Sequence, residues 1–293
     1  MNNGKIVGLG EALWDVLPEG KKLGGAPANF AYHVSQFGLE SCVVSAVGED
    51  ELGDEIIENF KAKRLDCLIE KVSYPTGTVQ VRLDEAGVPQ YEITENVAWD
   101  NIPYTAKLER LAKQTRAVCF GSLAQRSEVS RATIGRFLDA MPASDDSLVV
   151  FDVNLRQQFY DADILDWSMR RCNVLKINDE ELEIIARIFA LTDSGIDGRS
   201  RQLISRFGLK MLILTCGTSG SYLFTGDDCS FCETPKVEVA DTVGAGDSFT
   251  AAFVSSIIKG RSVADAHRTA VGVSAFVCTQ NGAMPELPKI FTE

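Results

Sequence analysis

The sequence predicts an α/β fold with a mainly parallel central sheet and helices on both of its faces. Short, continuously apolar runs alternate along the chain with segments of helical periodicity. Apolar runs of this kind are typical of strands covered on both faces, and repeated strand–helix–strand units are typical of parallel sheets with right-handed crossovers. Residues 76–95 depart from this pattern because they alternate in the way that a hairpin does. We therefore predict one central sheet and a smaller separate sheet.

The elements of the central sheet can be placed in order along the chain. Expected strands are 5–10, 42–48, 117–121, 148–154, 174–178, 211–217 and 221–226. Expected helices are 26–37, 51–63, 127–140, 179–190, 198–207, 244–258 and 262–279. The clearest break is an expected loop at 192–200, which is too short to separate two domains, and we find no repeat or low-complexity linker. We predict a single α/β domain over residues 1–293.

A small second sheet is predicted from residues 12–23 and 76–95. Val79, Val81 and Ile93 lie at alternating positions of two expected strands, and DEAGVP between them is a suitable turn. We interpret this sheet as a lid over a binding site. The alternative is an edge hairpin of the central sheet.

Composition excludes several classes of partner. The chain has 293 residues, of which 45% are hydrophobic, and a net charge of −12, which argues against nucleic acid or an anionic membrane as a partner. Its apolar N-terminal run is too short for a signal peptide, and no run approaches the ~20 residues of a membrane span. We therefore expect a cytoplasmic protein. Among its eight cysteines only Cys229 and Cys232 form a CxxC pair, for which reduced thiols are favoured over a metal or redox site.

Polar and glycine residues gather where several expected strands end. Ligands of open parallel sheets bind at the carboxyl ends of the strands, so these residues predict a polar ligand that carries phosphate. They are Asp152, Asn154 and Arg156, then Lys176 and Asn178, then Thr215, Gly217 and Gly220.

Three small residues, Gly244, Ala245 and Gly246, precede Asp247 at the expected start of helix 244–258. Small side chains let a ligand approach the backbone, and the first amides of a helix attract anions. Phosphoryl transfer needs such an anion hole and a group that accepts the hydroxyl proton, and Asp247 offers the latter. The alternative makes Thr242 a helix cap and Asp247 an ordinary acid of the first turn. The chain has neither a P-loop nor a protein-kinase motif.

Two long motifs resemble the signatures of one family. DTVGAGDSFTAAF resembles the second signature of the ribokinase-like, or PfkB, carbohydrate kinases, and GGAPANFAYHVSQFG at 24–38 resembles the first. They stand over 200 residues apart in the family's order, and the resemblance covers essentially the whole chain. GEALWDVLPEGKKLGGAPAN, FGSLAQR and FDVNLR are most similar to bacterial fructokinases.

The resemblance implies a ribokinase-like fold and an ATP- and Mg²⁺-dependent kinase that transfers the γ-phosphoryl group of ATP to a sugar hydroxyl. The expected reaction converts D-fructose to D-fructose 6-phosphate. Alternatives are ribose, 2-keto-3-deoxygluconate or a nucleoside as substrate, or a catalytically silent sugar-binding regulator, which the presence of Asp247 disfavours. Some members also use K⁺, and the family's lid often builds a homodimer.

The resemblance also implies roles for individual residues. Asp247 is the base, and the amides of Gly244, Ala245 and Gly246 stabilise the transferring phosphate. Sugar hydroxyls bind to Asp15, Gly25 and Asn29, while Arg156 meets sugar or phosphate. Glu181, with Asn178, organises water and Mg²⁺, whereas Thr215, Gly217 and Gly220 form part of the nucleotide site, and Asp241 borders the monovalent-cation site of some members.

Each of these roles has a structural alternative. Asn178 and Glu181 also have the spacing of a capping box at the start of helix 179–190. Asp15 alternates with its neighbours as any water-facing strand residue would, and Gly25 and Asn29 could simply open helix 26–37.

Overall fold

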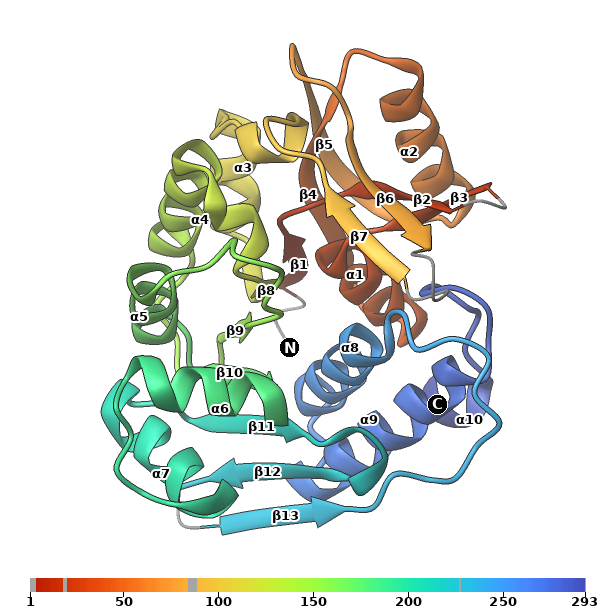
Figure 1. The fold of residues 1–293 in the computed structure, drawn as a ribbon. Helices are drawn as coiled ribbons and strands as arrows, with labels where there is room; N and C mark the ends of the chain where they lie inside the picture. The colour runs from red at the N-terminus through yellow and green to blue at the C-terminus, as the bar shows by residue number, and fades with distance from the viewer. Residues whose placement is uncertain (1–3, 18–19, 84–88, 227, 293) are drawn as a thin grey trace.

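A nine-stranded sheet forms the centre of the molecule (Figure 1), within residues 4–17, 20–83, 89–226 and 228–292, which the computed structural model describes. Its strand order is β13-β12-β11-β10-β9-β8-β1-β4-β5, and all neighbours from β11 to β5 pair in parallel. The strands are β1 (Lys5–Leu9), β4 (Ser41–Gly48), β5 (Asp66–Val72), β8 (Thr115–Phe120), β9 (Leu148–Asp152), β10 (Val174–Asn178), β11 (Met211–Thr215), β12 (Ser221–Thr225) and β13 (Asp228–Cys232). The predicted mainly parallel sheet is confirmed.

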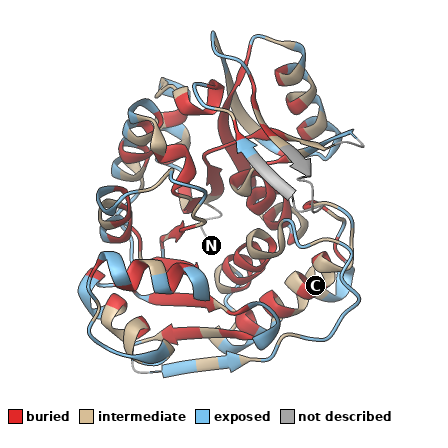
Figure 2. Cartoon of the chain, viewed as in Figure 1, coloured by how far each residue is buried: buried red, intermediate tan, exposed pale blue. Residues whose placement is uncertain are grey.

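Helices cover both faces of this sheet because successive strand residues point to opposite sides. Phe151 and Leu175 pack in one apolar core, whereas their neighbours Val150 and Val174 pack in another. The first core is closed by α3 (Ala106–Ala112), α4 (Glu128–Ala140), α5 (Ala162–Arg171), α6 (Asp179–Ile188) and α7 (Gly195–Phe207). The second is closed by α1 (Ala26–Gln36), α8 (Ala245–Ile258) and α9 (Val263–Cys278). Figure 2 shows the resulting burial along the strands.

The remaining helical elements are α2 (Glu51–Ala62), α10 (Lys289–Thr292) and the short 3-10 turns η1 (Ala98–Asn101), η2 (Leu123–Arg126) and η3 (Gly217–Ser219). Ile56 and Phe60 of α2 pack in a third apolar core. In the described part of the chain, no helix combines the length and hydropathy that crossing a bilayer requires.

A separate four-stranded sheet lies beside the central one. Its order is β3 (Gly20–Gly24), β2 (Leu13–Leu17), β6 (Gly77–Leu83) and β7 (Pro89–Ile93), with β2 and β6 parallel and the outer pairs antiparallel. The predicted second sheet is confirmed, and the edge-hairpin alternative is wrong. Residues 84–88 of the expected turn lie outside the described residues. Strand β3 ends at Gly24, and α1 begins only two residues later, at Ala26.

Several described elements were not expected from the sequence, among them two strands and two helices. Strand β5 carries charged residues among its apolar ones and forms one edge of the central sheet. Strand β13, which holds the free thiols Cys229 and Cys232, forms the opposite edge and is largely exposed. Helix α3 has seven residues, and α5 has a polar composition. The expected loop at 192–200 is also too long, because α7 begins at Gly195.

Candidate active site

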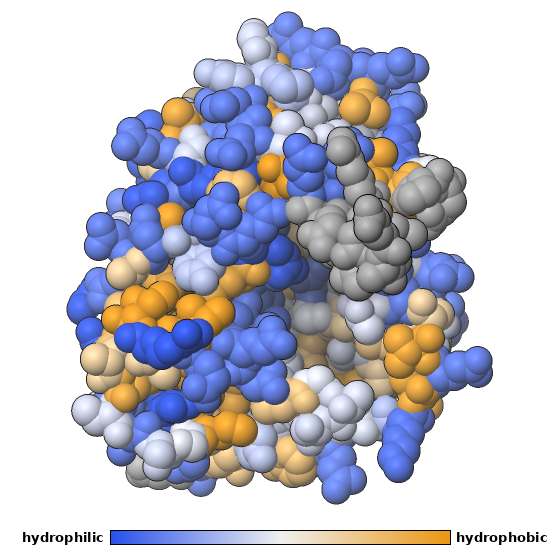
Figure 3. All heavy atoms as spheres, viewed as in Figure 1, coloured by the Kyte–Doolittle hydropathy of each residue, from blue (hydrophilic) through white to orange (hydrophobic). Residues whose placement is uncertain are grey.

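The predicted catalytic and sugar-binding residues come together where α8 and α1 begin. Asn29 Nδ2 on α1 donates a hydrogen bond of 2.8 Å to Asp247 Oδ2 on α8, across 218 positions of the sequence. The oxygen of the same side-chain amide, Asn29 Oδ1, is buried without a hydrogen-bond partner in the described structure. The face shown in Figure 3 is hollowed at its centre, in the same region as the start of α8 and the loop that follows β9 in Figure 1. The two halves of the predicted site are therefore one site.

Asp247 lies in surroundings that favour its protonated form. Burial raises the pKa of its carboxyl group to about 6, and the charge of Asp152 acts in the same direction. The hydrogen bond from Asn29 and the charges of Lys176 and Arg156 oppose this shift. A carboxylate with a pKa near 6 is ionised at neutral pH and yet basic enough to accept a proton.

The turn before Asp247 requires glycine. Gly244, the N-cap of α8, has φ 78°, and a Cβ atom there would lie 2.7 Å from Ala283 Cβ and 2.8 Å from Ala283 Cα. The amide of Ala245 donates to the carbonyl of Thr242 at 3.3 Å, whereas the amides of Gly246 and Asp247 have no hydrogen-bond partner among the described residues. Free amides at the start of a 14-residue helix form a site for an anion.

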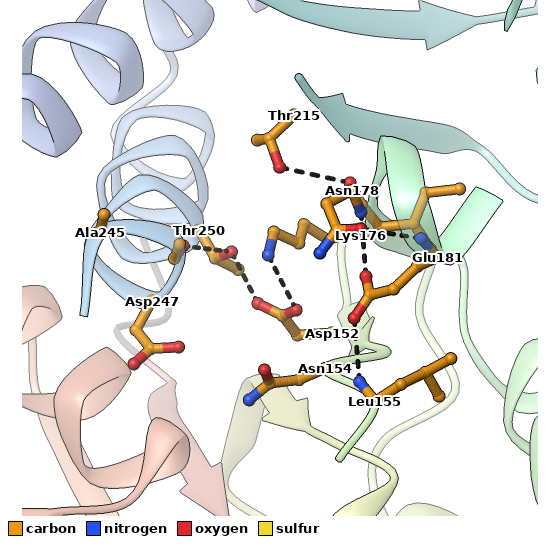
Figure 4. Close-up of polar contacts among 12 residues, drawn as sticks. Asp152, Asn154, Leu155, Lys176, Asn178, Glu181, Thr215, Ala245, Asp247 and Thr250 are labelled. Atoms are coloured by element: carbon orange, nitrogen blue, oxygen red, sulfur yellow. Dashed lines mark hydrogen bonds and ion pairs between the residues drawn. The ribbon is translucent and has the colours of Figure 1, made fainter. Parts of the chain in front are cut away.

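Lys176 lies against this turn. A Cβ atom on Gly246 would lie 2.9 Å from Lys176 Nζ, so glycine at this position leaves room for the ammonium group. Lys176 Nζ is 3.1 Å from Asp152 Oδ1, and Thr250 Oγ1 lies 3.1 Å from Asp152 Oδ2 (Figure 4). Burial acts to lower the pKa of Lys176, but Asp152, Glu181 and Asp247 together raise it above its usual value. The site therefore contains a buried cation beside the free amides.

Lys176 and Asp152 were noted at strand ends but not assigned to the site by sequence reasoning. The usable signal was a charged residue inside otherwise apolar strands, VLKIN and LVVFD. Buried charges are rare unless they are paired or functional.

Glu11 was also missed. It follows β1 and is buried, and its Oε2 atom has no hydrogen-bond partner in the described structure. Burial raises the pKa of Glu11 to about 7; the nearby charge of Asp247 adds to the shift, and Arg156 opposes it. The pattern that could have found it is an acid placed directly after a buried strand.

The sugar-binding residues expected from the sequence line the same region. Asp15 on β2 is half-buried; burial raises its pKa to about 6, and the charge of Arg156 opposes the shift. Gly25 has φ 115°, and a Cβ there would lie 2.3 Å from the carbonyl oxygen of Glu11. Arg156 is exposed and acts electrostatically on Glu11, Asp15 and Asp247. One cation therefore faces three carboxyl groups.

Asn178 and Glu181 form the capping box of α6. Asn178 Oδ1 accepts from the amide of Glu181 at 2.8 Å, and Glu181 Oε2 accepts from the amide of Asn178 at 2.9 Å. Glu181 Oε1 accepts a third bond, from the amide of Leu155 at 2.9 Å. Both carboxylate oxygens are thus engaged by backbone, so the capping role is present. In the described residues no three acidic, histidine or cysteine side chains group as a metal cage.

The expected nucleotide residues lie at the end of β11, the strand next to β10. Thr215 Oγ1 lies 3.5 Å from the carbonyl oxygen of Ile177. Gly217 (φ 51°) and Gly220 (φ 119°) bound the turn η3, and a Cβ on Gly220 would lie 2.6 Å from the carbonyl oxygen of Cys232. Within the described structure, no hydrogen bond joins these three residues to Asp247.

Asp241 links two turns beside the free amides. Its Oδ1 atom accepts from the amide of Val243 at 3.0 Å, and its Oδ2 atom accepts from the amide of Gly282 at 3.1 Å. Lys22 Nζ on β3 lies 3.7 Å from the same Oδ2 atom. These contacts give Asp241 a structural role, and its part in a cation site stays a prediction.

Comparison with known families decides what kind of site this is. A sequence profile described as "pfkB family carbohydrate kinase" matches residues 18–290. The chain belongs to this family. The resemblance of the two glycine-containing motifs is thereby confirmed, and the protein is an ATP-dependent sugar kinase.

Individual relatives agree with this membership. The chain is 30% identical to a fructokinase of Klebsiella pneumoniae, over 98% of this chain and 97% of that protein. It is 29% identical to an ATP-dependent 6-phosphofructokinase of Thermoanaerobacterium thermosaccharolyticum, over 93% of this chain and 84% of that protein. The fold is also similar to that of a fructokinase of Vibrio cholerae O395 with fructose, ADP and a calcium ion bound (TM-score 0.82, 24% identity, 100% of both chains).

For a PfkB kinase, the geometry supplies both requirements of phosphoryl transfer to a hydroxyl group. Asp247 can accept a proton, while the amides of Gly246 and Asp247 and the ammonium group of Lys176 can stabilise negative charge. All three donors lie within one turn of α8 or against it.

Proposed function

We propose that this PfkB kinase phosphorylates D-fructose to D-fructose 6-phosphate with MgATP. The observation that carries the proposal is Asp247, which Asn29 holds at the N-terminus of α8, where two backbone amides are free. Fructokinases among the relatives support the choice of sugar.

In the proposed reaction, Asp247 takes the proton of the sugar hydroxyl group while the oxygen of that hydroxyl group forms a bond to the γ-phosphorus of ATP. The bond from that phosphorus to the oxygen shared with the β-phosphate breaks, and ADP leaves. Asn29 keeps Asp247 oriented, and its unpartnered Oδ1 atom is available to accept from a sugar hydroxyl. The amides of Gly246 and Asp247, with Lys176, stabilise the charge of the moving phosphoryl group.

The nucleotide and its metal would be held at the ends of β10 and β11. Thr215, Gly217 and Gly220 would face the nucleotide, and Asn178 and Glu181 would reach Mg²⁺ through water. This fits the engaged carboxylate of Glu181, because protein-bound Mg²⁺ commonly keeps several waters and relies on substrate phosphates. When bound, Mg²⁺ neutralises charge on the phosphates. A K⁺ site at Asp241, a homodimer through the small sheet and a cytoplasmic location belong to the same proposal.

A sugar that already carries phosphate is a second candidate because one relative is a 6-phosphofructokinase. The charges around the sugar region argue against it. Glu11, Asp15 and Asp247 face two exposed cations there, Arg156 and Lys22. A second phosphate would meet mostly negative charge, so we favour an uncharged sugar.

The test is an ADP-release screen of about a dozen sugars and sugar phosphates, with NMR of the product to locate the new phosphate. We expect the highest kcat/KM for D-fructose and phosphate on its 6-hydroxyl. A higher kcat/KM for ribose, 2-keto-3-deoxygluconate or fructose 6-phosphate would replace this assignment.

A further inference from the structure

His33 lies on α1, one turn after Asn29, and it is fully buried. Its Nε2 atom is 2.8 Å from the carbonyl oxygen of Ala283, and its Nδ1 atom is 3.4 Å from Gln36 Nε2. A carbonyl oxygen only accepts, so Nε2 carries the hydrogen and Nδ1 accepts from the Gln36 amide. Burial lowers the pKa of His33 to about 4, and the charge of Lys63 adds to that shift. The ring is therefore neutral at neutral pH, and both of its nitrogens are engaged.

Ala283, which His33 holds, is the residue that packs against the turn before Asp247. A Cβ atom on Gly244 would lie 2.7 to 2.9 Å from Ala283 atoms, so the two backbones are already in close approach. Asp241 also ties Gly282 to this turn. Any shift of the 282–283 backbone would be transmitted to Gly244 and to the free amides that follow it.

The same face of α1 fixes the rest of this segment. Gln36 Nε2 donates to the carbonyl of Pro285 at 3.2 Å, and Gln36 Oε1 accepts from the amide of Leu287 at 2.6 Å. Asn29, His33 and Gln36 follow one another at spacings of four and three, which places them along one helix face. One face of α1 therefore holds both the carboxylate of Asp247 and the segment behind the anion-binding turn.

We propose that His33 is a positioning residue for phosphoryl transfer. Through Ala283 it sets the position of Gly244, and thereby of the amides of Gly246 and Asp247 that receive the phosphoryl group. This rests on the proposed function, since it assigns those amides to the transferring phosphate.

The test compares two variants that differ in where they place a donor. Glutamine at position 33 can put an N–H near the position of Nε2, whereas asparagine reaches only the position of Nδ1. We expect H33N to lower kcat by about 10- to 100-fold, because small misplacements at a reacting centre have effects of that size. KM for the sugar should stay within about threefold, and H33Q should recover most of kcat.

His267 provides a matched control. It is the second histidine of the chain, it is also buried, and its nitrogens lie 2.8 Å from Ser221 Oγ and 2.9 Å from Ser230 Oγ. We expect H267N to lower the melting temperature with kcat within about threefold of wild type. If H267N loses as much kcat as H33N, the effect is general destabilisation and the proposal is wrong.

Two further outcomes would overturn the proposal: a wild-type kcat in H33N, or equal loss in H33Q and H33N. Should H33N fail to fold, Gln36→Met removes the donor to Nδ1, together with the bonds to Pro285 and Leu287 on the same segment, and is expected to lower kcat without raising KM. All assays use the sugar with the highest kcat/KM for the wild-type enzyme. A wrong substrate assignment therefore shows in the wild type, whereas a wrong role for His33 shows only among the variants.

Discussion

Asp247 accepts a hydrogen bond from Asn29 while burial raises its pKa to about 6. Asp247→Asn keeps the size of the side chain and an oxygen for Asn29, but it removes the proton acceptor. We expect kcat to fall by about 10²–10⁴-fold, the usual contribution of a positioned general base. Sugar affinity, measured by titration calorimetry, should change little. If Asp247 were only a first-turn acid, its replacement would leave kcat within about threefold of wild type.

The pH dependence of the reaction follows from the same carboxyl group. Below its pKa of about 6, Asp247 is protonated and cannot accept a proton. We therefore expect kcat/KM to fall about tenfold per pH unit below about pH 6 and to level off above it. A profile of kcat/KM with sugar at saturating MgATP measures this. A flat profile across that range would mean that Asp247 does not act as the base.

A second buried carboxyl group, Glu11, makes the stability of the fold depend on pH. Its pKa of about 7 in the folded protein lies above its usual value of 4.5, so the fold favours the protonated form. Stability is therefore lost as pH rises through this interval, and Glu11→Gln should raise the free energy of unfolding by about 1–3 kcal/mol near pH 8. Near pH 4.5 the gain should vanish. Denaturant unfolding at both pH values measures it, with exposed Glu58 changed to Gln as the control. Equal gains at both values would exclude this cause.

At the scale of elements, Glu181 at the N-terminus of α6 has a capping role and a predicted role in Mg²⁺ binding. Glu181→Gln keeps only one of the two oxygens that accept from Leu155 and Asn178. We expect a loss of about 1–3 kcal/mol, because one buried amide loses its acceptor, and a higher Mg²⁺ requirement. Thermal unfolding and a Mg²⁺ titration at fixed ATP measure the two effects.

A substitution in a different helix cap distinguishes the loss of capping from the loss of Mg²⁺ binding. Asp161 caps α5 through a hydrogen bond of 2.7 Å from the amide of Ile164. Asp161→Ala should lower stability and leave the Mg²⁺ titration unchanged. If Glu181→Gln behaves in the same way, the capping box is the whole role of Glu181.

Elements with one clear hydrophobic pattern could be predicted from the sequence, whereas elements that mix apolar and charged residues could not. Central strands such as β10 and β11 are apolar, apart from Lys176 and the polar residue that ends each strand, because both faces are covered. Strand β5 escaped prediction because it lies at an edge, where charged residues replace part of the apolar pattern. In the site, Asp247 was found from its neighbours in sequence. Glu11 and Lys176 were not, because their importance depends on the distant elements that they face.

At the scale of the whole molecule, the small sheet is the part expected to respond to substrate. Strands β6 and β7 belong to the sheet that carries Asp15 on β2. We expect amide hydrogen exchange in residues 77–83 and 89–93 to slow when sugar is added, because closure over the sugar would exclude water. Strand β5 of the central sheet is the internal control. Unchanged exchange at saturating sugar would show that the small sheet is a fixed part of the fold.

The short connection between β3 and α1 has a consequence for how much ATP the enzyme consumes when no sugar is bound. A single residue, Gly25 with φ 115°, separates the small sheet from the helix that carries Asn29. Movement of the small sheet would therefore pull directly on the residue that orients Asp247. Closure of the sheet over a sugar would then adjust the hydrogen bond by which Asn29 orients the base. A water molecule in place of the sugar would not draw the sheet closed, so the enzyme would waste less ATP by hydrolysis.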